Sequence, residues 1–191
     1  MESDRKMRIV SGELKGKKIH HVKSNLTRPL KDQVKESIFN IINHSNLFQI
    51  KIKHSEILDL YSGTGSFGIE CLSRGAKQVN FVEQNNIPFN ILKNNLRETN
   101  LQNKSLCSNM NVSEFLKINK KKFDIIFFDP PFKNLDYLEE IKQIKEFLLY
   151  KKNNLIIIHR EKRSDEHYPN FFKILKESFY GRSKILFGTI F

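Results

Sequence analysis

The chain has 191 residues, a length that fits one domain with a single substantial hydrophobic core. No apolar run is long enough to cross a bilayer, no secretory signal stands at the amino end, and Cys71 and Cys107 lack metal-ligand spacing. We therefore expect a cytoplasmic protein with reduced cysteines, no membrane segment and no metal site.

The formal net charge is +12, from 33 lysine and arginine residues against 21 aspartate and glutamate residues. A balance of this sign attracts phosphate backbones and predicts a nucleic acid as the partner. The alternative is a lysine-rich composition of the kind that AT-rich genomes encode. The uneven distribution favours nucleic acid, because ten of the basic residues fall within the first 35 positions.

The amino-terminal segment has an organisation of its own. Residues 7–11 and 17–20 flank a glycine-containing turn at 12–16, which predicts a basic β-hairpin. The hairpin offers few core residues, so we expect it to lie outside the main sheet and to grip a phosphate backbone. The candidate RNA-binding residues are Arg8, Lys15, Lys17, Lys18, Arg28 and Lys31.

An amphipathic helix is predicted after the hairpin, with Val34 and Ile38 on its apolar face. Asp32 is its expected N-cap or first-turn acid. We divide the chain into an amino-terminal extension at 1–45 and a core domain at 46–191, which together form one compact unit.

The first strand of the core domain, at 56–60, leads into a loop with glycines at 63, 65 and 68, and then into a helix. Gly63 and Gly65 let the backbone turn tightly and approach a ligand, with the amino end of the helix facing it. A dinucleotide is one candidate ligand. Asp59 argues against it, because a carboxylate before the loop would repel a pyrophosphate, whereas it could accept hydrogen bonds from the ammonium of an amino-acid-like ligand.

The next strand, at 78–83, ends in Glu83. At the switch point of a doubly wound sheet, a carboxylate in this position accepts from ribose hydroxyls. A solvent-exposed glutamate at a strand end is the plainer alternative. Together with the glycine loop, Glu83 implies a ligand with a ribose, an amino-acid tail and no phosphate, a description that S-adenosylmethionine meets.

Helices and strands alternate along the rest of the chain, which predicts an α/β fold with a mostly parallel sheet. A terminal hairpin is expected to add one antiparallel strand at an edge. The predicted helices span 88–101, 112–118 and 135–149, and the predicted strands span 104–108, 125–128, 155–158, 172–180 and 184–191.

A quartet of residues follows the strand that ends at Phe128: Asp129, Pro130, Pro131 and Phe132. A strand that ends in an X-Pro turn is common and would explain the prolines alone. An acid, two prolines and an aromatic ring at a strand end also form a rigid platform, which suits gripping a planar group and accepting hydrogen bonds from its amine.

Several segments together resemble the RsmD family of 16S ribosomal RNA methyltransferases, which act on a guanine N2 amine. The resemblance covers nearly the whole chain from Met7. It is carried by Arg8-Ile9-Val10-Ser11-Gly12, Lys15-Gly16-Lys17, Thr27-Arg28-Pro29 with residues 34–40, residues 58–65, residues 72–76 and the quartet.

The resemblance implies a class I methyltransferase, Rossmann-like fold with a seven-stranded sheet and helices on both faces. It also implies S-adenosylmethionine as the methyl donor and a basic extension that engages 16S ribosomal RNA. We expect the RNA to be bound within an assembling small subunit and the enzyme to be a monomer. One departure stands at Asn111, where the family usually carries an aspartate that contacts the adenine amine. An asparagine oxygen can accept the same hydrogen bond, so we expect only a modest change in donor affinity.

Asp129 and the backbone carbonyl of Pro130 are expected to accept the protons of the guanine amine and free its lone pair, while Phe132 stacks on an unpaired base. Two other functions stay open. An adenine N6 methyltransferase of DNA or RNA uses the same kind of quartet, although 191 residues leave no room for a separate target-recognition domain. A non-catalytic RNA-binding or ribosome-assembly factor on this scaffold would have no need for Asp59, Glu83 and Asp129.

Overall fold

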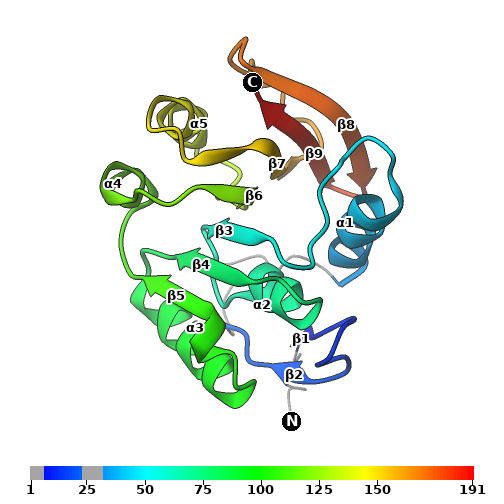
Figure 1. The fold of residues 1–191 in the computed structure, drawn as a ribbon, viewed down its shortest axis with the longest axis vertical. Coiled ribbons are helices and arrows are strands. Elements are labelled where there is room, and N and C mark those ends of the chain that lie inside the picture. The colour runs from blue at the N-terminus through cyan, green and yellow to red at the C-terminus, as the bar shows by residue number, and fades with distance from the viewer. Residues whose placement is uncertain (1–6, 23–31) are drawn as a thin grey trace.

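The computed structural model describes residues 7–22 and 32–191 of the chain. Its centre is a seven-stranded sheet with the strand order β5-β4-β3-β6-β7-β9-β8 (Figure 1). The expected α/β fold with a mostly parallel sheet is confirmed. The strands are β3 (Glu56–Leu60), β4 (Gln78–Val82), β5 (Ser105–Ser108), β6 (Phe123–Phe128), β7 (Tyr150–Glu161), β8 (Phe172–Tyr180) and β9 (Ser183–Ile190).

The terminal hairpin corrects one prediction. The antiparallel strand was expected at an edge, but β9 lies between β7 and β8 and runs antiparallel to both. The side chains explain this placement, because Ile185, Leu186 and Phe187 are all fully buried and suit an interior strand with both faces covered. Strand β8 carries exposed charges such as Lys173 and Glu177, which protect an edge.

Helices cover both faces of the sheet, as expected. One face carries α1 (Asp32–His44), α2 (Ser66–Ser73) and α3 (Asn86–Glu98), and the other carries α4 (Val112–Ile118) and α5 (Tyr137–Glu146) (Figure 1). A short 3₁₀ helix, η1 (Gln102–Lys104), precedes β5. None of the helices in the described residues is long and apolar enough to pass through a membrane.

Alternation along the strands builds two hydrophobic layers. In β6, Ile125 and Phe127 face the α1–α3 side, whereas Ile126 and Phe128 face the α4–α5 side. The ring of Phe67 on α2 stacks on Phe127 with 4.0 Å between ring centroids. The core is therefore filled directly beneath the carboxyl ends of the central strands.

The amino-terminal hairpin has shorter strands than predicted, β1 (Met7–Arg8) and β2 (Lys18–Ile19). It lies outside the main sheet but is packed against α2, because the buried side chains of Ile9 and Ile19 belong to the same hydrophobic cluster as the sheet. The buried carboxylate of Glu70 accepts hydrogen bonds from the backbone N–H groups of Val10 (2.7 Å) and Ser11 (2.9 Å). The hairpin is thus fixed to the helix that follows the glycine loop.

Candidate active site

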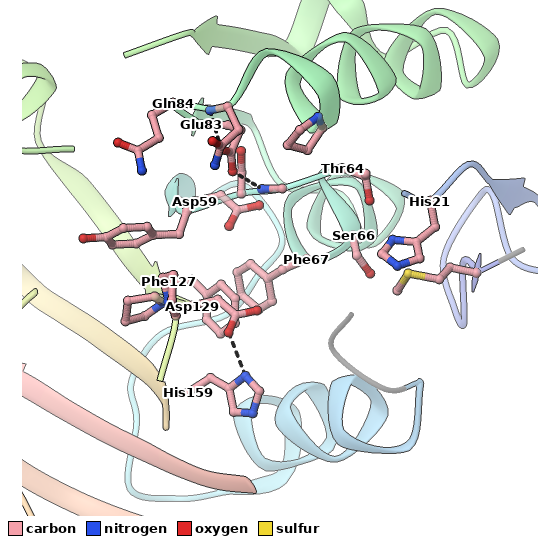
Figure 2. A pocket seen from close by; sticks show the side chains of 18 of the residues that line it. His21, Asp59, Thr64, Ser66, Phe67, Glu83, Gln84, Phe127, Asp129 and His159 are labelled. Atoms are coloured by element: carbon pink, nitrogen blue, oxygen red, sulfur yellow. Dashed lines mark hydrogen bonds and ion pairs between the residues drawn. The ribbon is translucent and has the colours of Figure 1, made fainter. Parts of the chain in front are cut away.

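A pocket of about 320 Å³ opens at the carboxyl ends of β3, β4, β6 and β7 (Figure 2). In open α/β sheets, ligands bind in the crevice outside these strand ends. Elements far apart in sequence meet here, including the glycine loop, the quartet and both ends of the amino-terminal hairpin. Among the lining residues are Met7, His21, Asp59, Tyr61, Gly63, Phe67, Glu83, Gln84, Asp129, Pro130, Pro131, Phe132 and His159.

The two glycines predicted to cradle a ligand have different positions. Gly63 lines the pocket with φ of 54°, and a Cβ there would meet no atom within 4 Å. Gly65 is the left-handed N-cap of α2, with φ of 86°, and a Cβ there would lie 2.4 Å from a methyl group of Leu92. Gly65 therefore shapes the loop through packing, whereas Gly63 faces the ligand space.

Glu83 lies at the end of β4 and is 7% exposed. One carboxylate oxygen accepts from the N–H of Gly63 at 2.9 Å, and the other accepts from the N–H of Asn85 at 2.7 Å. Oε1 also accepts from the side-chain amide of Asn85 at 3.0 Å, so the remaining capacity of Glu83 to accept from a hydroxyl group lies on Oε2. The prediction of a ribose contact fits this position.

Asp59 is nearly fully buried at the bottom of the pocket, where it accepts a hydrogen bond from the N–H of Gly68 at 3.0 Å. Burial raises the pKa of Asp59 well above its usual range, and the like charges of Asp129 and Glu83 raise it further. Three carboxyl groups therefore face one small space. Such a site favours a cationic ligand, which would offset the cost of keeping them ionised.

The quartet follows β6, and all four of its members line the pocket. The Asp129 carboxylate is paired with the ring of His159 on β7, with 2.8 Å between Oδ1 and Nδ1 (Figure 2). No donor from the described residues reaches the carbonyl of Pro130, so its lone pairs are available to a ligand. The predicted platform is thus assembled beside the glycine loop.

Asn111 does not line this pocket. Its side-chain oxygen accepts from the N–H of Ser113 at 2.8 Å and caps α4, while its amide group lies 3.4 Å from Gln84. The contact with an adenine amine therefore stays a prediction, although Gln84, the partner of Asn111, does line the pocket.

The candidate RNA-binding residues of the hairpin lie at the surface. The side chains of Arg8, Lys15, Lys17 and Lys18 are exposed, although Lys17 donates to the backbone carbonyl of Glu98. Arg28 and Lys31 fall outside the described residues. The structure also places Met7 and His21, at the two ends of the hairpin, in the pocket wall, which the sequence did not indicate.

Comparison with known proteins assigns the chain. The model of the family described as conserved hypothetical protein 95 matches residues 7–189. The chain belongs to this family. The RsmD resemblance is thereby confirmed, since several relatives at 33–35% identity are named ribosomal RNA small subunit methyltransferase D.

The relative of that name from Haemophilus influenzae is 35% identical over 92% of this chain and 89% of its own length. The one from Buchnera aphidicola (strain APS) is 33% identical over 90% and 87%. A solved structure of a candidate methylase from Haemophilus influenzae, 32% identical, superposes with a TM-score of 0.75 over 96% of this chain and 97% of its own. The chain is a methyltransferase, and the class I methyltransferase fold is confirmed.

Sequence reasoning missed two residues that hold the quartet in this methyltransferase. His159 and Arg160 lie next to each other near the carboxyl end of β7, and both are buried. Arg160 donates to the carbonyls of Pro131 (3.3 Å) and Phe132 (2.8 Å). The available signal was the pair of polar residues directly after the apolar run 155–158. In a parallel sheet these residues lie near the carboxyl ends of the strands, as Asp129 does.

Proposed function

We propose that the chain transfers a methyl group from S-adenosylmethionine to the exocyclic N2 amine of a guanine in small-subunit (16S) ribosomal RNA. The observation that carries the proposal is one pocket, in which the quartet meets the cradle of Asp59, Gly63 and Glu83. The relatives' name, ribosomal RNA small subunit methyltransferase D, supports the substrate class.

The residues present fit the donor. S-adenosylmethionine carries an ammonium group, a sulfonium and a ribose, and the pocket offers three carboxyl groups beside a glycine turn. Asp59 and Glu83 would hold the donor, with Gly63 allowing its close approach. When bound, S-adenosylmethionine supplies an electrophilic methyl group on a good leaving group.

The remaining chemistry falls to the quartet. The lone pair of a guanine amine is delocalised into the ring, which makes the amine a poor nucleophile. Asp129 and the carbonyl of Pro130 accept hydrogen bonds from its two N–H groups. These bonds favour a tetrahedral nitrogen with a free lone pair. Phe132 stacks on the purine, so the amine is oriented as well as activated.

The hairpin supplies the grip on RNA in this proposal. Exposed Lys15 and Lys18 on a ribbon fixed to α2 would contact phosphates, and the base would be flipped into the pocket. The same proposal has three further parts. The chain divides into an RNA-binding extension at 1–45 and a methyltransferase domain at 46–191. The enzyme is a monomer in the cytoplasm, and its substrate is an assembling small subunit.

A tritium-transfer assay tests the function. Wild-type protein with labelled S-adenosylmethionine is given naked 16S RNA, assembled small subunits or DNA, and the product is digested to nucleosides. We expect label in N2-methylguanosine from RNA or from subunits. Label in N6-methyladenosine would establish the adenine enzyme instead, and transfer to no substrate would favour the non-catalytic assembly factor. An Asp129→Ala sample controls for contaminating activity.

A further inference from the structure

We propose that His159 is a positioning residue, which orients the Asp129 carboxylate toward the reacting amine. The role of Asp129 as the acceptor rests on the proposed function. The orientation itself rests on contacts that do not depend on which base is methylated.

Strand pairing brings the two residues together. Strands β6 and β7 are parallel, with Phe128 opposite Ile158. The next residues, Asp129 and His159, therefore lie side by side near the carboxyl ends of these strands. The distance from Nδ1 of His159 to Oδ1 of Asp129 is 2.8 Å, and the histidine side chain is only 5% exposed. The imidazole is therefore a fixed partner for a carboxylate that borders an open pocket.

The two partners of the ring together set its tautomer, because a carboxylate only accepts whereas a hydroxyl can donate or accept. Nε2 of His159 lies 2.9 Å from the hydroxyl of Ser183 on β9. When that hydroxyl donates to Nε2, the ring proton is on Nδ1 and is donated to Asp129. This bond uses Oδ1, and no donor from the described residues reaches Oδ2, which remains for the substrate amine. The carboxylate cannot rotate away without losing a charge-assisted hydrogen bond.

The same ring also supports the stacking platform. Phe132 stands edge-on to His159, with 5.5 Å between centroids and 83° between planes. Side chains alternate along a strand, so Arg160 points to the opposite face, where it donates to the carbonyls of Pro131 and Phe132. Glu166 in turn accepts from Nε of Arg160 at 2.8 Å. Two consecutive residues of β7 thus hold the quartet from both faces of the sheet.

Three variants separate positioning from packing. His159→Asn keeps an N–H near the place of Nδ1, His159→Leu fills space without a donor, and His167→Leu is a matched control at an exposed histidine. We expect His159→Leu to lower kcat on RNA by about 10- to 100-fold, the factor for one lost hydrogen bond to a charged group. His159→Asn should recover most of kcat, and the control should equal wild type. Donor Kd and the KM for RNA should stay within about twofold in all three.

The outcomes separate this proposal from the proposed function. Equal kcat in wild type and His159→Leu would overturn it, and so would equal losses in the Leu and Asn variants together with a lower Tm, because that pattern reports packing alone.

An ¹⁵N-histidine NMR spectrum tests the positioning role of His159 without any RNA. We expect a proton on Nδ1 of His159 whose signal shifts in Asp129→Ala and Ser183→Ala and is unchanged in His167→Leu. An unshifted signal in Asp129→Ala would overturn the proposal even for an enzyme with another substrate.

Discussion

The carboxylate of Glu83 accepts a hydrogen bond from the backbone N–H of Gly63, with 2.9 Å between Oε2 and the nitrogen. Glu83 follows β4 and Gly63 follows β3, and these strands are parallel neighbours in the sheet. The bond therefore joins the two sides of the crevice in which a ligand binds. It also means that Glu83 is already oriented before the donor arrives, so less ordering is left to accompany binding.

The first prediction concerns Glu83→Gln. Glutamine keeps the size of the side chain but loses the charge that strengthens hydrogen bonds from ribose hydroxyls. We expect the Kd for S-adenosylmethionine to rise by about 10- to 100-fold in calorimetry, with RNA affinity unchanged. Glu114→Gln, at an exposed position in the first turn of α4, is the matched control. An unchanged donor Kd would remove Glu83 from the donor site.

The second prediction concerns the quartet. Asp129→Asn preserves shape but replaces a carboxylate by a weaker acceptor, and we expect kcat to fall by at least about 100-fold while donor and RNA affinities change little. Phe132→Ala should cost less, because stacking orients the base without activating its amine. Single-turnover methylation measures both variants, with the exposed Asp165→Asn as the control. Wild-type turnover in Asp129→Asn would mean that the charge of Asp129 is not needed, and wild-type turnover in Asp129→Ala would reduce Asp129 to a strand-end residue.

The third prediction concerns the hairpin. Lys15→Glu combined with Lys18→Glu should weaken RNA binding and reduce the log–log salt slope by about one unit for each lost phosphate contact. Lys17 is left intact, because it donates to the carbonyl of Glu98. Filter binding at several salt concentrations measures the effect.

The control for the hairpin variant is a second charge reversal, Lys120→Glu with Lys122→Glu. These exposed lysines precede β6 and so lie at the amino ends of the strands, on the opposite side of the sheet from the pocket at the carboxyl ends. Equal losses in the two double variants would mean that the hairpin contributes only net charge. A loss of donor affinity in the hairpin variant would instead indicate that the hairpin closes over the donor, since Met7 and His21 border the pocket.

The fourth prediction concerns Glu140 on α5, which accepts a hydrogen bond from the hydroxyl of Tyr61 at 2.8 Å. Burial raises the pKa of Glu140 to about 7, from 4.5. The folded state therefore holds a proton that the unfolded state has released, so this group's contribution to stability declines as the pH rises from about 4.5 to about 7. Glu140→Gln cannot titrate. Its free energy of unfolding relative to wild type should rise across this window and level off above it, in urea unfolding at several pH values. A difference independent of pH would contradict the shift.

Sequence patterns predicted the bounds of a helix or strand correctly where the element depends on residues that are close together in the chain. Apolar periodicity placed α4 at 112–118 and β8 at 172–180 with the observed bounds. β7 was predicted only at 155–158 but spans Tyr150–Glu161, because pairing with β6 and β9 holds polar residues in a strand that propensity alone would not favour.

The site followed a similar division. Asp59, Gly63, Glu83 and the quartet could be predicted to lie at one site, and all of them line the pocket, because each stands near the end of a strand or in the turn that follows it. His159 could not be assigned, because its partners Asp129 and Ser183 are 30 and 24 residues away and only strand order brings them together. The placement of β9 was missed for the same reason: hairpin chemistry fixes which strands pair, but not which of them joins the existing sheet.

The position of β9 has a consequence for the order in which the protein can be completed. It is synthesised after the other six strands of this sheet, yet it pairs with β7 on one side and β8 on the other. Until residues 183–190 have left the ribosome, β8 has no strand partner and β7 presents a free edge. A chain that stops at Arg182 would expose this edge and one end of the core to other chains, so translation has to pass residue 190 before the sheet is protected from aggregation.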